Sequence, residues 1–465
     1  MGNGTVFEIT PGGTLTTLLS FCATGGCPSK CADGDNPKAG LVPDPDGNFY
    51  GTTNNGGPNQ GGGGGTFCEY GCGTIFKITP GRTETILYDF CNLTDCGDGA
   101  APYARLLRGP DGNFYGTTAF GGAHGDGTIF RVTPSGVLTT LYSLCSQSRC
   151  TDGEFPYAGL AQAIDGDFYG TTYSGGATGV GTVFKITPSG TLTTLYSFCT
   201  RTACTDGKNP YAGLVRGTDG EFYGTTSQGE GYTHGTIFKI TPSGTLTTLY
   251  TFCSRQYCED GYDPYAGLVQ ATNGDFYGTT FSGGAAYCNG GCGTIFSLSV
   301  GLPRFVKTQP TSGKVGAAVT ILGTNLTGAS SVSFDGAAAA FTAVSATEIT
   351  STVPAGATTG SVQVVTPSGT LLSNAPFLVL PDSMATTMVH VRVDEKVKED
   401  AAKTLAAMGM SVSVRMLLVR VAAEKALPFD VRVPNATTVK AMQAADRGAG
   451  KRFKTADALF KDLGI

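Results

Sequence analysis

Residues 181–199 read GTVFKITPSGTLTTLYSFC, and this stretch decides the fold of the first 300 residues. Apolar and polar side chains alternate over residues 183–186, and again over residues 192–198. Two alternating segments joined by a Pro-Ser-Gly turn are typical of a β-hairpin. The stretch therefore predicts two short antiparallel strands.

The same phrase returns at regular intervals. Gly-Thr-Val/Ile-Phe begins at Gly4, Gly73, Gly127, Gly181, Gly235 and Gly293, with inner intervals of 54 residues and outer intervals of 69 and 58. Each repeat also contains a segment such as PYAGLVRGTDGEFYGTT, residues 210–226, which adds two strands around an Asp-Gly turn. Four short strands per repeat predict the blades of a β-propeller. A β-solenoid is the alternative, although its coils are usually shorter.

The repeats do not divide into whole blades. Five hairpins of the second kind meet six Gly-Thr-Phe segments. We expect an N-terminally truncated propeller of about five blades over residues 1–300, with an unknown ligand. It is either closed by pairing of the N-terminal strands with the last blade or left incomplete. GTIFKITPSGTLTTLYTF and DGDFYGTTFSGG resemble the GloVer repeat family of bacterial extracellular proteins, which implies a secreted or surface-anchored propeller.

Fourteen of the 15 cysteines form pairs at short spacing, and we predict disulfides for them. Each loop is so short that one bridge contributes roughly 2 kcal/mol. Cys31 makes the count odd and competes for Cys22 or Cys27, or stays free. The predicted pairs are Cys22/Cys27, Cys68/Cys72, Cys91/Cys96, Cys145/Cys150, Cys199/Cys204, Cys253/Cys258 and Cys288/Cys292.

Zinc is the alternative for these cysteines, but we expect pairs on successive blades to diverge, whereas zinc needs four converging ligands. We therefore predict no metal and no cofactor. Seven bridges indicate an oxidising compartment.

Other polar groups give weak signals. The Asp-Gly steps recur in every repeat, which indicates a structural turn rather than a catalytic group. The Tyr-Gly-Thr-Thr segments are predicted to pack between blades rather than to line a sugar site. Departures limited to one repeat are His124, Glu230, Tyr232 and His234, all in the Gly-rich loops between second and third strands. His234 could ligate a metal together with Glu230, but we interpret it as a solvated loop histidine. Nothing in the repeats predicts an enzyme.

Residues 303–380 have a different rhythm, with strands of five to seven residues between Gly, Asn and Ser turns. This spacing predicts a β-sandwich. PTSGKVGAAVTILGTNL, VSFDG and ITSTVPAGATTGSVQVVTPSG resemble an IPT/TIG immunoglobulin-like domain. The resemblance implies a spacer or a binding module.

The composition changes at Met384. Residues 1–383 carry 17 Lys+Arg against 27 Asp+Glu, whereas residues 384–465 carry 14 against 9. All cysteines precede this point, and six of the seven methionines lie at or after it. No apolar run is long enough to predict a membrane span. Two composition regimes indicate two evolutionary sources.

The last 82 residues predict a strand and two helices. Residues 388–394, MVHVRVD, alternate, and Asp394 can cap a helix that runs to Met408. A second helix follows Ser413 and ends before Pro428. Two copies could pair their strands into a ribbon that fits a DNA major groove, with Ser411 and Ser413 near phosphate. An ordinary solvated strand is the alternative.

VHVRVDEKVKEDAAKTLAAMGMSVS, VRMLLVRVAAEKALPFDVRVPNATTVKAM and ALFKDLGI resemble a complete RelB/DinJ-type antitoxin of the type II toxin-antitoxin systems. The resemblance implies a ribbon-helix-helix homodimer over residues 384–429 that binds operator DNA. It also implies a tail over 430–465 that neutralises a ribosome-dependent mRNA-cleaving toxin. Met388, His390 and Arg392 match the DNA-facing positions, and Lys451, Arg452, Leu459, Phe460 and Leu463 fall in the toxin-binding tail.

The sequence departs from this family at the second helix, where Val414 follows Ser413 without the two residues that usually intervene. Two missing residues rotate the start of that helix by roughly 200°. The phosphate contact of Ser413 depends on this rotation.

The two regimes predict different compartments, extracellular or cell surface for residues 1–380 and cytoplasmic for residues 384–465. We therefore expect a non-enzymatic, mainly β chimera: a propeller, an Ig-like sandwich and a small helical antitoxin module, with Met384 as the module's own start. The alternative is a secreted repeat protein whose tail is a fusion or assembly artefact.

Overall fold

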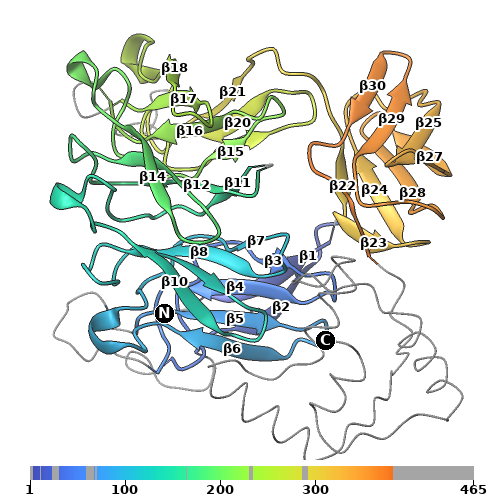
Figure 1. Ribbon diagram of the computed structural model, residues 1–465. Coiled ribbons are helices and arrows are strands. Elements are labelled where there is room, and N and C mark those ends of the chain that lie inside the picture. The colour runs from blue at the N-terminus through green and yellow to red at the C-terminus, as the bar shows by residue number, and fades with distance from the viewer. Residues whose placement is uncertain are drawn as a thin grey trace, which may run out of the picture. The chain divides into compact units, whose positions relative to one another are not determined.

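The computed structural model describes residues 4–10, 12–22, 31–58, 68, 71–163, 165–229, 234–284 and 292–380. The chain divides into two compact units, Met1–Asp382 and Ser383–Ile465. The second unit, which holds the predicted ribbon-helix-helix module, lies outside the described residues. The described part of the first unit is almost entirely β-structure (Figure 1).

Four complete antiparallel sheets of four strands follow one another along the chain. We call them sheets 1 to 4 in chain order. Sheet 1 contains β3 (Val42–Pro43), β4 (Phe49–Thr53), β5 (Thr74–Ile78) and β6 (Glu84–Asp89). Sheet 2 contains β7 (Leu107–Arg108), β8 (Phe114–Thr118), β9 (Thr128–Val132) and β10 (Leu138–Ser143). Sheet 3 contains β11 (Ala161–Gln162), β12 (Phe168–Thr172), β13 (Thr182–Ile186) and β14 (Leu192–Ser197). Sheet 4 contains β15 (Val215–Arg216), β16 (Phe222–Thr226), β17 (Thr236–Ile240) and β18 (Leu246–Thr251).

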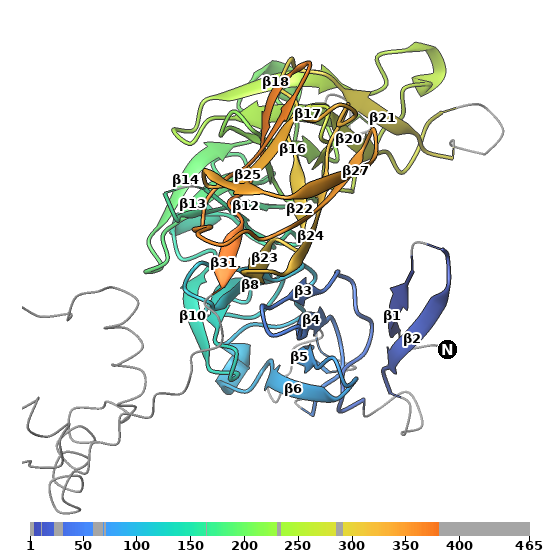
Figure 2. The ribbon, with the colours of Figure 1, turned by 90° about the vertical axis from the view of Figure 1, so that its right-hand side faces the viewer.

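Incomplete sheets lie before and after these four. The N-terminal hairpin contains β1 (Thr5–Ile9) and β2 (Leu15–Ser20), and the terminal sheet contains β19 (Val269–Gln270), β20 (Phe276–Thr279) and β21 (Ile295–Leu298). Among the described residues β1 pairs with β2 and β21 pairs with β20, so the N-terminal strands do not complete the last sheet (Figure 2). The first of the two predicted arrangements, a ring closed in this way, is therefore not the one observed.

The hairpins form where the sequence pattern predicts them. Thr187 and Thr191 close the turn between β13 and β14, and the Gly190 N–H donates to the Thr187 carbonyl at 2.9 Å. Gly190 has a φ of +93°, which explains why glycine ends the Pro-Ser-Gly turn. In β13 every side chain except Lys185 is buried, because neighbouring sheets cover both faces of the strand.

Consecutive sheets are joined by one recurring aromatic contact. A tyrosine on the second strand of each sheet stacks against the phenylalanine that begins the second strand of the next sheet. Such pairs contribute about 0.5–1.5 kcal/mol beyond area burial. The pairs, with ring centroids 4.1–4.2 Å apart, are Tyr50–Phe114, Tyr115–Phe168, Tyr169–Phe222 and Tyr223–Phe276.

Short 3-10 turns follow the fourth strands. They are η1 (Thr94–Cys96), η2 (Ser148–Cys150), η3 (Thr202–Cys204) and η5 (Gln256–Cys258). None of the helices in the described part of the chain is long and apolar enough to cross a membrane.

Residues 305–380 form a separate β-structure with a buried core that includes Val306, Ile321 and Phe377. Its two four-stranded sheets have the orders β22-β24-β28-β27 and β26-β25-β29-β30, and β23 pairs in parallel with β31. The strands are β22 (Lys307–Gln309), β23 (Ser312–Lys314), β24 (Ala318–Leu322), β25 (Ser331–Phe334), β26 (Ala337–Ala339), β27 (Phe341–Ser345), β28 (Glu348–Thr352), β29 (Val362–Thr366), β30 (Gly369–Leu372) and β31 (Leu378–Leu380).

Glu84 is an exception to the repeat pattern with a testable consequence. It occupies the position that leucine holds in sheets 2 to 4, and burial raises its pKa from 4.5 to about 7. Because the folded state retains the proton to a higher pH than the unfolded chain, stability falls as pH rises from about 4.5 to about 7.

We expect Glu84→Gln to raise the melting temperature at pH 8 and to leave it nearly unchanged at pH 4. Scanning calorimetry at both values checks this, with Glu8→Gln on exposed β1 as the control. An equal gain for Glu84→Gln at both values would show that ionisation of Glu84 is not the cause.

Candidate functional site

The loop after each fourth strand is built around an aspartate, which is buried in sheets 1 to 3 and partly buried in sheet 4. In sheet 3 the Asp206 carboxylate accepts hydrogen bonds from the Tyr196 hydroxyl at 2.7 Å and from the backbone N–H groups of Thr200 and Arg201 at 2.9 and 3.4 Å. The Thr200 hydroxyl also donates to it at 3.1 Å. Asp98, Asp152 and Asp260 make the same contacts to tyrosine and backbone in the other complete sheets. The same group recurs in each complete sheet, where it holds the loop in place.

A disulfide closes each of these loops. Within the described residues the structure places bridges at Cys68–Cys72, Cys91–Cys96, Cys145–Cys150, Cys199–Cys204 and Cys253–Cys258. Cys292 is also disulfide-bonded, and its predicted partner Cys288 lies outside the described residues. Four of these pairs tie the end of a fourth strand to the 3-10 turn that follows it, whereas Cys68–Cys72 lies between β4 and β5.

The first predicted pair is wrong. Cys22 bonds to Cys31, nine residues away, with their Cα atoms 4.8 Å apart, and not to Cys27. Sequence spacing favoured Cys27 because it matches the other repeats, but Cys31 is brought back by the chain that leads to β3. Cys27 lies outside the described residues.

Four cysteines of sheet 1 converge, whereas our expectation of divergence concerned equivalent pairs on successive blades. Their sulfur atoms all lie within 4.8 Å of one another, and the Cys68 and Cys91 sulfurs are 3.9 Å apart. They are Cys68, Cys72, Cys91 and Cys96. The prediction of divergence compared cysteine pairs on different sheets. This cluster instead joins the loop before β5 to the loop after β6 within sheet 1. Because both pairs are closed as disulfides, the cluster has no thiolate to offer a metal.

Two smaller groups occupy the same place in other sheets. His234 lies with Cys253 and Cys258, and Asp126 lies with Cys145 and Cys150. His124 is exposed; burial raises the pKa of Asp126, and the nearby His124 acts in the opposite direction. Glu230 and Tyr232 lie outside the described residues, so the structure does not test a metal site that joins Glu230 to His234.

Sequence reasoning placed the Tyr-Gly-Thr-Thr tyrosines between sheets, and the stacked pairs described above agree with that placement. The Asp-Gly steps are hydrogen-bonded turns, in which Asp219 accepts from the Glu221 N–H at 3.2 Å and from the Tyr223 hydroxyl at 2.8 Å.

A second row of tyrosines was missed. Tyr103, Tyr157, Tyr211 and Tyr265 come from the Pro-Tyr step of successive repeats, and neighbouring rings lie 5.0–5.5 Å apart. Burial raises the pKa of Tyr157 and of Tyr211, so both phenols stay neutral. The recurring Pro-Tyr was the available signal, and it indicates a contact row because each ring meets the next repeat.

The predicted DNA- and toxin-binding residues all lie outside the described part of the chain. They are Met388, His390, Arg392, Ser411, Ser413, Lys451, Arg452, Leu459, Phe460 and Leu463. What is known of this region comes from similarity to other proteins.

Three protein families match the chain. The Gloeobacter/Verrucomicrobia repeat matches residues 63–296 and 203–329, the IPT/TIG domain matches 303–379, and the RelB antitoxin matches 386–463. All three resemblances predicted from sequence are confirmed.

Individual relatives match only the last region. Antitoxin DinJ of Escherichia coli strain K12 and of strain B / BL21-DE3 are each 45% identical over 84 residues, which is 17% of this chain and 98% of the relative. Among solved structures, an auxiliary nutrient binding protein from Bacteroides ovatus is 12% identical with a TM-score of 0.36, covering 64% of this chain and 65% of that one. That likeness establishes neither a shared fold nor a shared function.

The matches account for the change in composition at Met384, since different families lie on its two sides. The chain belongs to the Gloeobacter/Verrucomicrobia repeat family, and it is a chimera that carries an IPT/TIG domain and a C-terminal member of the RelB antitoxin family.

Proposed function

We propose that residues 384–465 work as an antitoxin that binds operator DNA as a dimer and neutralises an mRNA-cleaving toxin. The observation that carries the proposal is the 45% identity to antitoxin DinJ across 98% of its length. A match over nearly the whole relative includes both the segment proposed to bind DNA and the segment proposed to bind toxin.

The proposal assigns separate tasks to separate residues. Arg392 belongs to the segment predicted from sequence to form an alternating strand, and its guanidinium can donate two hydrogen bonds to a guanine edge. Phe460 lies in the tail, where an aromatic side chain buried by a partner contributes much of the binding free energy.

Separate tasks predict separable losses in the full chain. We expect Arg392→Ala to weaken binding to the DNA upstream of its own gene by about tenfold or more and to leave toxin binding intact. We expect Phe460→Asp to weaken toxin binding about thirtyfold or more and to leave DNA binding intact. Electrophoretic mobility shift and titration calorimetry measure the two, with Asp446→Ala as the control. Loss of both activities in each variant would contradict the assignment.

We also propose that residues 1–380 form a non-enzymatic, extracellular-type propeller and Ig-like scaffold. The disulfides support this, because such bonds persist in oxidising compartments. The antitoxin belongs in the cytoplasm beside DNA and ribosomes, so the two parts are proposed to work in different compartments. Alkylation of free thiols in the same full-chain preparation tests the scaffold: fully reduced cysteines in a protein that still binds DNA would contradict it.

A further inference from the structure

The terminal sheet lacks a strand that every complete sheet contains. In sheets 1 to 4 the third strand pairs with a fourth, but within the described residues β21 pairs only with β20. The chain does not turn back after Leu298; it continues until the Phe305 N–H donates to the Thr272 carbonyl at 3.0 Å. The outer edge of β21 is thus left without its usual partner.

The exposed fractions of two side chains show that the terminal sheet is less covered than the complete sheets. Ile295 is 83% exposed, whereas its counterparts Ile75, Ile129 and Val183 are 0% exposed. Tyr277 is 39% exposed because, within the described residues, no further sheet supplies a phenylalanine like those that stack on the corresponding tyrosines of sheets 1 to 4. The terminal sheet therefore presents apolar side chains that the same fold buries elsewhere.

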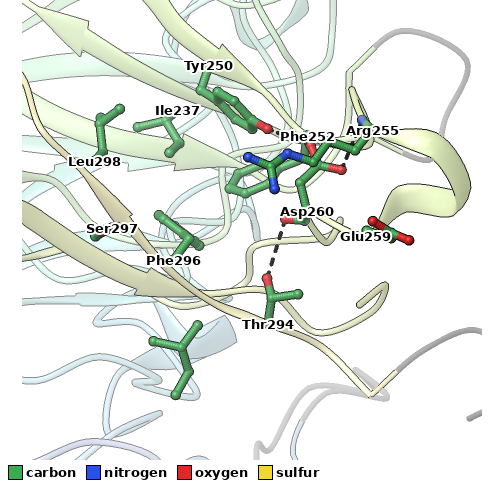
Figure 3. Close-up of a pocket in the computed structure, with 11 residues that line it drawn as sticks. Ile237, Tyr250, Phe252, Arg255, Glu259, Asp260, Thr294, Phe296, Ser297 and Leu298 are labelled. Carbon is green, nitrogen blue, oxygen red and sulfur yellow. Dashed lines mark hydrogen bonds between the residues drawn. The ribbon is translucent and has the colours of Figure 1, made fainter. Parts of the chain in front are cut away.

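A groove of about 360 Å³ lies where the fourth strand would run. Figure 3 shows Tyr250, Phe252 and Arg255 of sheet 4 on one side of it, and Phe296 and Ser297 of β21 on the other. The counterparts of these sheet 4 residues one repeat earlier contact an actual strand, β18. Sheets 3 and 4 thus show what fills such a groove.

Three contacts that β18 makes with sheet 3 indicate what kind of strand would fit the groove. Leu246, the first residue of β18, is buried in one cluster with Val183, Phe198 and Tyr196 of sheet 3. Its carbonyl accepts a hydrogen bond from Arg201 Nη2 at 3.0 Å, and the Thr248 hydroxyl donates to the Thr205 carbonyl at 3.3 Å.

Each of these partners has a counterpart that lines the groove. The apolar residues that contact Leu246 correspond in the groove to Ile237, Tyr250 and Phe252. Arg255 stands at the position of Arg201, and Glu259 stands at the position of Thr205. The groove therefore fits an aliphatic side chain at the first position of a strand and a threonine at the third.

The register of the complete sheets indicates which residue would stand at the fifth position of a strand in the groove. In sheet 3 Val183 lies opposite Tyr196, and Ile186 lies opposite Leu192. By this register Ile295 faces a tyrosine at the fifth position of the occupant, and Leu298 faces the leucine at the first. A tyrosine there would cover the exposed Ile295.

We propose that β21 and this groove accept an extended segment of a partner polypeptide with the pattern Leu-x-Thr-Leu-Tyr, which adds as the fourth strand of the terminal sheet. Main-chain hydrogen bonds to the exposed edge of β21 contribute affinity, and the contacts of the partner's side chains in the groove contribute specificity. A second copy of this chain is a poor donor, because its described fourth strands already pair in their own sheets.

The test uses the full chain and a synthetic peptide, GTLTTLYSF, with the sequence of residues 190–198. We expect saturable binding by fluorescence anisotropy, together with slower amide exchange at Ile295–Leu298. Ile295→Asp is expected to weaken binding at least about tenfold, since it places a charge against the tyrosine. Val137→Asp, at a position 63% exposed in the turn between β9 and β10, is the control and is expected to bind normally.

A second test changes only the peptide, so it does not depend on whether the Ile295→Asp protein folds. In this peptide Thr194→Pro removes a main-chain donor from the strand. Weaker binding of this peptide to the unchanged protein supports strand addition. The proposal is overturned if no peptide binds, if both peptides bind equally, or if the β21 amides that face away from β20 are already protected without peptide. Self-association that Ile295→Asp abolishes, measured by sedimentation, would identify a second copy as the occupant and overturn the assignment to a partner.

Discussion

Replacing Asp206 with alanine is expected to lower the free energy of unfolding of the repeat sheets by about 3 kcal/mol. The carboxylate is completely buried and accepts hydrogen bonds from one tyrosine hydroxyl, one threonine hydroxyl and two backbone N–H groups. Alanine leaves these donors without an acceptor in a space that water does not readily reach, and each such donor costs about 1–3 kcal/mol.

Two further variants show whether the loss of stability comes from the lost hydrogen bonds or from the lost charge. Asp206→Asn retains one carbonyl acceptor and is expected to lose less than Asp206→Ala. Glu259→Ala removes the same charge from an exposed loop position and is expected to change stability by less than about 0.5 kcal/mol. Urea unfolding followed by tyrosine fluorescence gives all three values, and similar losses for Glu259→Ala and Asp206→Ala would attribute the effect to charge alone.

Gly224→Ala is expected to destabilise the protein by about 2–3 kcal/mol, through overpacking rather than through backbone strain. Gly224 lies in β16 opposite Phe238, and an added Cβ would lie 2.6 Å from the Phe238 ring and 2.9 Å from Leu214. The ring has little room to retreat, because Phe238 is completely buried and its centroid lies 5.2 Å from that of Phe198.

Two further variants make this prediction specific. Gly267→Ala adds the same methyl group where the nearest atom is 3.7 Å away, and it is expected to be tolerated. Phe238→Leu frees the space above Gly224, so the double variant is expected to lose less stability than the sum of its single variants. Scanning calorimetry provides the comparison, and additive losses in the double variant would rule out the contact between Gly224 and Phe238 as the cause.

Sequence reasoning predicted the repeat sheets and their turns because both depend on short segments. The alternation around Lys185 and the glycine at position 190 require only neighbouring residues to specify a hairpin. The disulfide at Cys199–Cys204 is local in the same way. Cys22 shows the limit, because its partner Cys31 depends on how the chain approaches the next sheet.

In the candidate sites, too, sequence reasoning found the local features and missed those that join distant residues. Family resemblance to an antitoxin was readable from phrases such as VHVRVDEKVKEDAAKTLAAMGMSVS, since the match extends over nearly the whole of that family. The convergence of Cys68 with Cys91 was not readable, because it joins two loops 23 residues apart. The groove beside β21 escaped notice because a missing strand leaves no motif.

By itself the sequence determined the strands, the turns that join them, the three families and the change at Met384, because each follows from residues close together along the chain. Only the tertiary structure decided which sulfur atoms meet, which tyrosines touch the next sheet and which strand edge lacks a partner. These features depend on contacts between residues far apart in sequence, and side-chain volume and chain path settle such contacts only when the sheets pack together.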